Sequence, residues 1–471
     1  MKINLTQNKN FKLFKIISKV AQENNQTVYI VGGYVRDLLM QRKAPTDIDF
    51  VTEQSGIELA KAVGKELGDL KVSVFKTYGT AMIKYQDLDL EFVGARKESY
   101  SEDSRKPAVE TGTLEDDQKR RDFTVNALAI SLNAENFGEL IDPFNGREDM
   151  QNKILRTPLE PAQTYSDDPL RMMRAIRFAS VLHFEIEKNS LEAIKQEAER
   201  IKIVSMERIM VEFNKIMLSE KPSVGLKLME ETTLLEKIIP ELTALRGIEE
   251  VEGQTHKDNF WHTLEVVDNI SKNTDNLWLR WAALLHDIGK APTKKFVEKI
   301  GWTFHGHEFL GSKMVKNLFT RLKLPLGTDM KYVQKMVKLS SRPIALIDDG
   351  TSDSALRRLL FDAGEDLEDL FTLCKADITT KNSQKQEKFK KNFEYVAKKI
   401  KEVEEKDQVR NFQPPISGEE IMEMFQLKPG REIGILKEKV KEAILEGEIA
   451  NDKDEARNFV IKEAKLIGLK L

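Results

Sequence analysis

The sequence of 471 residues has a single cysteine, Cys374. One thiol cannot form an internal disulfide, and this scarcity is typical of proteins that stay in a reducing cytoplasm. The chain also has no apolar run long enough to cross a membrane. Residues 1–20 lack the continuous apolar core and small-residue cleavage site of a secretory signal. We therefore expect a cytoplasmic protein with no membrane partner.

An excess of charge of one sign is also missing. Lysine and arginine number 74 and aspartate and glutamate 77, which gives a formal net charge of −3 at pH 7. A protein that binds a long polyanion without sequence choice would be more basic, whereas a compact RNA held at a few phosphates needs only local basic patches. The length exceeds what one hydrophobic core supports, so we expect three or four domains.

Strand and helix signals alternate up to about residue 150 and then change. Short apolar runs such as residues 28–31 and 48–51 predict strands between helical patterns, which indicates a small α/β head. From residue 165 on, strand signals vanish and helical periodicity, interrupted by prolines, takes over. Residues 246–260, with two glycines and mixed polar residues, are expected to form a linker.

Two adjacent glycines, Gly32 and Gly33, follow a predicted strand and precede Arg36. Such a turn exposes backbone N–H groups beside a cation, and a helix starting there adds its positive end, which suits a triphosphate. Asp47 and Asp49 are two residues apart, so on a strand both carboxylates point to one face. A divalent ion is the usual partner of such a pair. The pattern indicates phosphoryl transfer from a nucleotide; the alternative for the aspartates alone is a solvated pair at a strand end.

Five blocks in a fixed order extend this pattern across residues 31–212. They are Gly32-Gly33-(x)2-Arg36-Asp37 with Asp47-x-Asp49, Arg120-Arg121-Asp122-Phe123-Thr124-Val125-Asn126-Ala127, Asp142-Pro143-Phe144-Asn145-Gly146, Asp167-Asp168-Pro169-Leu170-Arg171-(x)2-Arg174, and Glu207-Arg208-Ile209. One such motif is weak evidence, whereas five in order are strong evidence. The chain resembles the bacterial tRNA nucleotidyltransferase and poly(A) polymerase family, which belongs to the polymerase-β-like nucleotidyltransferases.

The resemblance implies that Asp47 and Asp49 hold Mg²⁺ in the head and are catalytic. Family members often add a third carboxylate from a later strand. Asp89 and Glu91 share one face of a predicted strand, and Glu91 better matches the family position; either could instead be an ordinary exposed acid. Residues 94–118 resemble the family's flexible catalytic loop.

The resemblance also assigns a nucleotide-binding group of residues in the head. Gly32, Gly33 and Arg36 would meet the triphosphate. Arg121 would belong to the nucleotide pocket and Asn126 to the sugar region. The alternative for Arg121 is membership of a surface salt bridge, which usually contributes little.

Asp168, Arg171 and Arg174 are spaced three residues apart and are expected to share one helix face. A carboxylate beside a guanidinium offers acceptors and donors that match the edge of a cytosine or an adenine. The resemblance implies that these residues choose CTP or ATP without a nucleic-acid template. The block has Asp167 where the family commonly has glutamate, a mild departure. The alternative is an ion pair that stabilises a helix.

A second candidate site contains most of the few histidines of the chain. Five of the six lie between residues 256 and 307. Their arrangement with nearby aspartates resembles the metal-binding order of the HD phosphohydrolases: His262, His286, Asp287 and Asp377, with His307 as a candidate further ligand. A buried Asp beside a buried His needs a partner, and a metal of unknown identity supplies one. The alternative is a set of core histidines satisfied by hydrogen bonds.

The resemblance covers the whole chain and predicts an α+β protein. A small mixed-sheet, polymerase-β-like head would be followed by an elongated all-α neck, HD domain and tail. The predicted domains are residues 1–150, the catalytic head; 151–245, a helical neck for nucleotide selection and RNA binding; 246–385, an HD phosphohydrolase-like domain; and 386–471, a helical tail for RNA binding.

The predicted function is addition or repair of the 3′-terminal CCA of tRNA from CTP and ATP. The predicted partners are tRNA and these nucleotides, and the HD domain is expected to act as a phosphodiesterase or phosphatase. The alternatives are a poly(A) polymerase, an enzyme that adds only CC or only A, and a phosphohydrolase whose head merely binds nucleotide. The sequence gives no indication of the oligomeric state.

Overall fold

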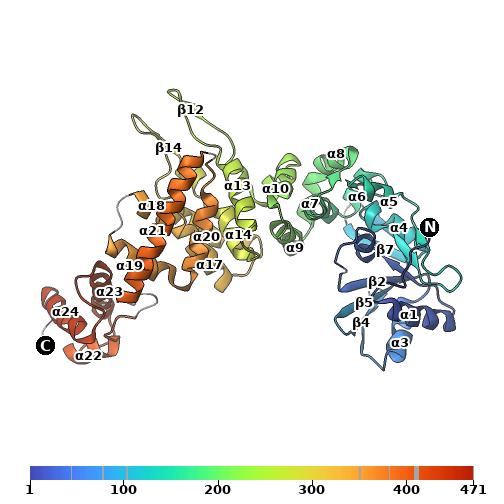
Figure 1. Cartoon of the computed structure of the whole chain (residues 1–471), viewed down its shortest axis with the longest axis horizontal. Helices are drawn as coiled ribbons and strands as arrows, with labels where there is room; N and C mark the ends of the chain where they lie inside the picture. Colours follow the sequence, from blue (N-terminus) through green and yellow to red (C-terminus); the bar gives the residue numbers. More distant parts are fainter. Residues whose placement is uncertain are drawn as a thin grey trace. The chain divides into compact units, whose positions relative to one another are not determined.

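The computed structural model describes residues 1–43, 45–76, 79–101, 104–348, 352–380, 382–407 and 413–469. The chain divides into two compact units, Met1–Pro240 and Glu241–Leu471 (Figure 1). Within the described residues, none of the helices combines the length and the apolar composition that a membrane span requires.

In the described part of unit 1, seven strands form one mixed sheet in the order β3-β4-β5-β2-β1-β8-β9. Only β2 and β5 run parallel to each other; the other neighbouring pairs are antiparallel. The strands are β1 (Tyr29–Val31), β2 (Asp47–Thr52), β3 (Val72–Phe75), β4 (Thr80–Tyr85), β5 (Leu88–Gly94), β8 (Ala129–Ser131) and β9 (Leu140–Ile141). The prediction of a mixed-sheet head is confirmed.

Helices flank this sheet, and most of the rest of unit 1 is helical (Figure 1). They are α1 (Phe11–Glu23), α2 (Gly33–Leu39), α3 (Gly56–Glu66), α4 (Leu114–Lys119), α5 (Gly146–Gln151), α6 (Pro161–Asp167), α7 (Leu170–Leu182), α8 (Lys188–Glu197), α9 (Met206–Met217), α10 (Pro222–Glu231) and α11 (Leu234–Ile238). Short 3-10 helices span Thr124–Asn126 and Ala198–Ile203.

The apolar face of the sheet packs against α1. Phe50 of β2 stacks on Phe92 of β5 with ring centroids 4.9 Å apart, and Phe14 of α1 meets Phe50 edge-on at 6.4 Å. All three rings are fully buried. Because side chains alternate along a strand, Asp47 and Asp49 lie on the opposite face of β2. Core packing therefore determines where the two carboxylates point.

Strands occur at two places in unit 1 where none was expected, and the expectation of no strands beyond residue 165 is wrong. Residues 94–118 contain a hairpin of β6 (Arg96–Ser101) and β7 (Ser104–Thr111), and their resemblance to the family's flexible catalytic loop stays a prediction. Beyond residue 165, β11 (Glu185–Ile186) pairs in parallel with β10 (Ile154–Leu155). A strand of two residues is too short to show the alternation on which sequence-based assignment depends.

Unit 2 is built mainly from helices. They are α12 (Pro240–Thr243), α13 (Asn259–Ser271), α14 (Leu277–Leu285), α15 (Lys290–Thr293), α16 (His307–Arg321), α17 (Thr328–Leu339), α18 (Arg342–Asp348), α19 (Asp353–Ala363), a 3-10 turn (Gly364–Asp366), α20 (Leu367–Asp377), α21 (Ser383–Asp407), α22 (Gly418–Phe425), α23 (Arg431–Glu446) and α24 (Lys453–Leu466). The apolar helix α14 lies at the centre, where Trp281 is fully buried against Phe319 of α16, with ring centroids 5.9 Å apart.

Two hairpins project from the helices of unit 2 (Figure 1). They consist of β12 (Glu250–Val251) with β13 (Gln254–Thr255), and β14 (Lys295–Val297) with β15 (Gly301–Thr303). The first hairpin occupies the predicted linker at residues 246–260, so that expectation is wrong. The α+β class is confirmed, whereas the division into four domains stays a prediction.

Candidate functional site

Four carboxylates lie on the face of the sheet that turns away from α1. The parallel strands β2 and β5 pair Asp47 with Asp89 and Asp49 with Glu91. All four side chains therefore project from one face. Asp89 is ion-paired with Lys84 at 3.0 Å, whereas Glu91 lies next to Asp49 in the register. Between the two candidates for a third carboxylate, the geometry favours Glu91.

The electrostatics of this cluster fit a bound cation. Burial raises the pKa of the Asp49 carboxyl, and although Arg121 opposes this shift, the charge of Asp47 adds to it. Burial also raises the pKa of Glu91, and the charge of Asp49 adds to that shift. Like charges on a partly desolvated face are unfavourable until a positive ion neutralises them. The predicted Mg²⁺ ligands therefore have the chemistry that a divalent cation requires.

The glycine turn borders this cluster. Gly32 has φ of +74°, a conformation that favours glycine. A Cβ at this position would lie 2.9 Å from Nη1 of Arg121 and 3.6 Å from Oδ2 of Asp49. The turn thus brings the backbone at the start of α2 beside a carboxylate and a guanidinium. Gly32 and Arg121, both predicted to bind nucleotide, lie together at the carboxylate cluster.

Arg36 is buried beneath the turn. Its Nε and Nη2 donate to the two carboxylate oxygens of Asp37 at 2.9 and 3.0 Å, and its Nη1 donates to Oδ1 of Asn126 at 2.7 Å. Its Nη2 lies 3.7 Å from where a Cβ on Gly33 would be. These bonds use each guanidinium nitrogen, so Arg36 fixes the turn against Asn126 in this structure.

Asp122 connects the head to α7. Its Oδ1 accepts from Nδ2 of Asn126 at 3.0 Å, and its Oδ2 accepts from Nε of Arg174 at 2.7 Å. Burial alone would raise the pKa of Asp122, but the Arg174 guanidinium and the Asn126 amide outweigh it and lower the pKa to about 2. A continuous polar network therefore links the glycine turn to a residue predicted to select the base.

Two buried acids that the motifs did not single out hold arginines in place. Asp117 is fully buried and accepts from Nε and Nη2 of Arg121 at 3.0 and 2.9 Å. It also pairs with Arg120. Glu212 pairs with Arg177 at 2.6 Å. The spacing of Asp117 four residues before Arg121 was the available signal, because such a pair shares one side of a helical turn.

The structure corrects the expected placement of Asp168 on a helix. Asp168 has an extended backbone (φ −135°, ψ 95°) and comes before α7, which starts at Leu170. The reason is Pro169, whose ring disfavours helical geometry in the preceding residue. Arg171 and Arg174 lie on α7 as expected, and Nη2 of Arg171 donates to the backbone carbonyl of Arg120 at 2.6 Å.

These residues nevertheless line one polar cavity of about 400 Å³. It is lined by Arg120, Arg121, Asp122, Asp168, Leu170, Arg171, Arg174, Arg208, Val211 and Glu212. Arginines and aspartates thus surround one concave surface that includes the three predicted base-selecting residues. Such a lining offers donors and acceptors to a polar, anionic ligand.

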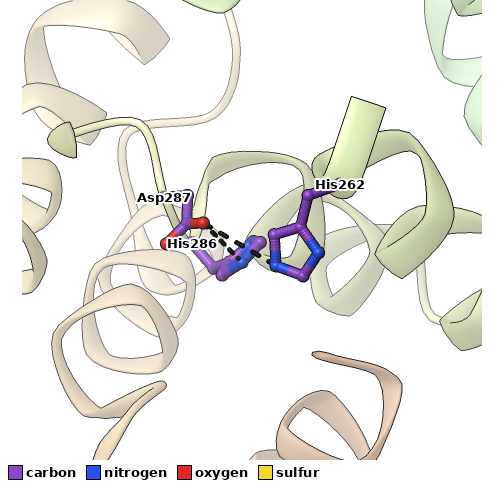
Figure 2. Close-up of side chains that lie close together, drawn as sticks. All are labelled: His262, His286 and Asp287. Atoms are coloured by element: carbon purple, nitrogen blue, oxygen red, sulfur yellow. Dashed lines mark ion pairs between the residues drawn. The ribbon is translucent and has the colours of Figure 1, made fainter. Parts of the chain in front are cut away.

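The predicted second site is assembled in unit 2. Figure 2 shows His262 of α13 directed toward His286 and Asp287, which follow α14. Nε2 of His286 lies 3.3 Å from Oδ2 of Asp287 and 3.5 Å from Oδ1 of Asp377. Nε2 of His262 lies 2.8 Å from that same Asp377 oxygen. The sequence therefore correctly anticipated which four side chains meet.

A fifth predicted residue, His307, borders the cluster. Its Nε2 lies 3.6 Å from Oδ1 of Asp287. A Cβ on Gly289 would lie 2.1 Å from the carbonyl oxygen of His307, so only glycine permits this close approach. Lys290 pairs with Oδ2 of Asp287 at 2.7 Å. The charge of His286 outweighs burial and holds the pKa of the Asp287 carboxyl well below its usual range.

The donor set fits a divalent metal. Nε2 of His286 is buried and makes no hydrogen bond with any described residue, although it faces two carboxylates. An imidazole nitrogen in that situation is unfavourable without a partner. His262, His286 and Asp287 offer ligand atoms that all lie within 4.8 Å of one another. Nitrogen and carboxylate ligands at such separations are typical of sites for transition metals.

Comparison with known families matches three segments of the chain. Residues 28–156 match the poly A polymerase head domain, and residues 259–377 match the HD domain. Residues 183–245 match a region described as the probable RNA and SrmB-binding site of polymerase A. These segments cover the carboxylate cluster and the histidine cluster.

Individual relatives extend over most of the chain. A CCA-adding enzyme of Bacillus velezensis is 30% identical over 95% of this chain and 97% of its own length. An A-adding tRNA nucleotidyltransferase of Aquifex aeolicus is 34% identical over 61% of this chain, which spans only 34% of that protein. A solved tRNA nucleotidyltransferase, complexed with a primer tRNA and an incoming ATP analog, is 27% identical with a TM-score of 0.55, covering 81% of this chain and 98% of its own. The chain therefore belongs to the tRNA nucleotidyltransferase family, as its motifs predicted, and is a nucleotidyltransferase.

Proposed function

We propose that this chain builds or repairs the 3′-terminal CCA of tRNA by metal-dependent transfer of nucleotides from CTP and ATP, without a nucleic-acid template. The observation that carries the proposal is the register of β2 and β5, which aligns Asp49 with Glu91 beside Asp47 and the Gly32 turn. The near full-length similarity to an enzyme named for CCA addition supports this specificity. A cytoplasmic location follows from tRNA as substrate.

Each group of residues has a part in this chemistry. Asp47, Asp49 and Glu91 would hold Mg²⁺, which supplies charge stabilisation at the attacking 3′-hydroxyl and the leaving pyrophosphate. Arg121 and the backbone of the Gly32 turn contact the phosphates, since both lie at the carboxylate cluster. Asp168, Arg171 and Arg174 would present acceptors and donors to the base edge, and Asn126 would lie near the sugar.

Incorporation into a tRNA that ends before CCA tests this specificity. With Mg²⁺ and CTP alone we expect two C additions, and with CTP and ATP together a single A after them, measured on a sequencing gel. Addition of A alone to a CC-ending tRNA, without C addition, would instead assign the A-adding activity named for the Aquifex aeolicus relative. A long run of A from ATP alone would indicate a poly(A) polymerase.

We further propose that the HD domain is a metal-dependent phosphohydrolase. His262, His286, Asp287 and Asp377 would bind a divalent metal, with His307 at its edge. Support comes from the buried Nε2 of His286, which faces carboxylates without a hydrogen bond to any described residue. A metal at such a site supplies an activated water and a positive charge for a phosphoryl group.

Substitution of Asp287 separates the two activities. Asp287→Asn should abolish hydrolysis of bis(p-nitrophenyl) phosphate in the presence of Mn²⁺, because a ligand carboxylate is lost, while CCA addition persists. Asp268→Asn, a matched change on α13, should leave both activities at the level of the original chain. Hydrolysis that survives Asp287→Asn would show that the phosphohydrolase assignment is wrong.

A further inference from the structure

The two nitrogens of each histidine in the HD cluster have different partners. Nδ1 of His286 lies 2.8 Å from the carbonyl oxygen of Ala283, and Nδ1 of His307 lies 2.9 Å from that of Phe304. A carbonyl oxygen only accepts, so both Nδ1 atoms carry the proton and donate. When either ring is neutral, as metal binding requires, its Nε2 presents a lone pair to the cluster. This is the usual arrangement of a histidine that binds metal.

His262 has the opposite arrangement. Its Nδ1 lies 2.7 Å from Nζ of Lys257, an ammonium that only donates. Nδ1 must therefore accept, and Nε2 carries the proton, which it donates to Oδ1 of Asp377 at 2.8 Å. Figure 2 shows this ring directed toward His286 and Asp287. His262 thus points its Nε2 into the cluster without a lone pair to offer.

Thr379 provides the alternative partner for His262. Its Oγ1 lies 3.2 Å from Nδ1 of His262 and 2.7 Å from Nζ of Lys257. If the proton of His262 resides on Nδ1, the Thr379 hydroxyl can accept it, and Nε2 becomes free to bind metal. The Lys257 ammonium and an Nδ1–H group cannot then face each other, because both are donors. Lys257 and a metal ion therefore exclude each other at His262.

We propose that Lys257 is a latch that holds His262 in its non-ligating tautomer, and that metal binding releases Lys257 to bind the phosphoryl group of the substrate. The change moves one proton from Nε2 to Nδ1 of His262 and alters no net charge on the ring. Lys257 is exposed and on a flexible stem, so it can swing away. The inference rests on the proposed phosphohydrolase function of the HD domain.

Substitution of Lys257 and substitution of Thr379 should change the metal affinity in opposite directions. Mn²⁺ is titrated into the full chain, and its binding is monitored by electron paramagnetic resonance. All variants also carry Asp47→Asn and Asp49→Asn, so that the head does not bind Mn²⁺. Lys257→Met should bind Mn²⁺ about tenfold more tightly, because the competing donor is gone, and Thr379→Val about tenfold more weakly, because the acceptor is gone. Thr379→Ser keeps the hydroxyl and should match the background, as should Lys272→Met, which changes the lysine directly after the end of α13.

Inorganic phosphate tests whether Lys257, once released from His262, binds a phosphoryl group. Saturating phosphate should tighten Mn²⁺ binding in the background protein, and this gain should disappear in Lys257→Met, since the two ligands are linked through one side chain. Unchanged Mn²⁺ affinity in both Lys257→Met and Thr379→Val would overturn the latch while leaving an Asp287-dependent metal site in place. If Asp287→Asn binds Mn²⁺ as well as the background does, the proposed metal centre itself is wrong and the latch with it.

Discussion

Asp49→Asn should lower the rate of nucleotide addition to tRNA by about 10³-fold or more, measured as kcat/KM for CTP. A metal ion at these carboxylates supplies several kcal/mol of charge stabilisation, and each 1.4 kcal/mol corresponds to a factor of ten in rate. Asp49 lies between Asp47 on its own strand and Glu91 across the register, so its loss removes the central carboxylate of the cluster.

The matched control is Asp89→Asn. Asp89 occupies the register position beside Asp47 and projects from the same face, but it pairs with Lys84. This change should alter the rate less than about threefold, because exposed ion pairs contribute little. An equal loss of activity in Asp89→Asn and Asp49→Asn would show that general disturbance of the sheet, and not metal binding, explains the effect.

The same Asp49→Asn change should stabilise the metal-free protein. Burial and the charge of Asp47 both raise the pKa of Asp49, so the carboxylate is unfavourable in the folded chain at neutral pH. Its replacement relieves about 1 kcal/mol and raises Tm by about 2–4 °C in the presence of EDTA. Addition of Mg²⁺ should stabilise the original chain more than the variant and so reverse the order.

The alternation of β2 made the carboxylate cluster predictable. Asp47 and Asp49 follow from a period of two residues, and the same period placed Glu91 on the matching face of β5. The resemblance favoured Glu91, but the spacing alone could not decide between Asp89 and Glu91, because that choice depends on the parallel register and on Lys84, which lies on a third strand. The alternation of each strand fixes which residues share a face, whereas the residue that lies opposite on a strand far along the chain is decided only when the sheet forms.

The placement of Asp168 shows how a local rule can override a spacing argument. The three-residue spacing to Arg171 suggested one helix face, yet Pro169 keeps Asp168 extended and outside α7. The residues still share a cavity, because the chain turns into the helix beside Arg120. The proline was visible in the sequence, whereas the cavity depends on segments far apart along the chain.

In the HD domain, residue order predicted which side chains lie together but not their hydrogen bonds. His262, His286, Asp287 and Asp377 meet because apolar helices pack around α14. The protonation pattern of His262 depends on Lys257, whose contact with the ring arises from the path of the chain between β13 and α13. Tautomers are set by such single contacts, so a motif does not encode them.

Asp122→Asn should weaken nucleotide discrimination as well as stability. Asp122 receives hydrogen bonds from Asn126 on one oxygen and Arg174 on the other. An amide nitrogen in place of an oxygen would face the Arg174 guanidinium and leave that cation without its partner. Displacement of Arg174 by about 1 Å should lower kcat/KM for the correct nucleotide by about 100-fold. Misincorporation of UTP or GTP should rise in parallel, which a purely structural loss would not produce.

The contribution of Asp122 to the free energy of unfolding should decrease as the pH falls. Its pKa is about 2 in the folded chain against an ordinary value of 3.8. A lowered carboxyl pKa stabilises the fold fully above the unfolded value, and this contribution, about 2 kcal/mol, is lost as the pH falls from about 4 to 2. The Asp122→Asn variant should therefore unfold at a lower urea concentration than the original chain at pH 6. Between pH 6 and pH 3, its urea midpoint should fall by less than that of the original chain.

The control is Asp167→Asn, a change on α6 at an acid bonded to Gln163 of the same helix. It should leave the urea midpoint at pH 6 and its decrease at pH 3 unchanged. The pH dependence of the free energy of unfolding arises from the proton that Asp122 gains on unfolding, and an asparagine side chain cannot bind that proton. If both variants lose the same stability in acid, the lowered pKa of Asp122 is not the cause.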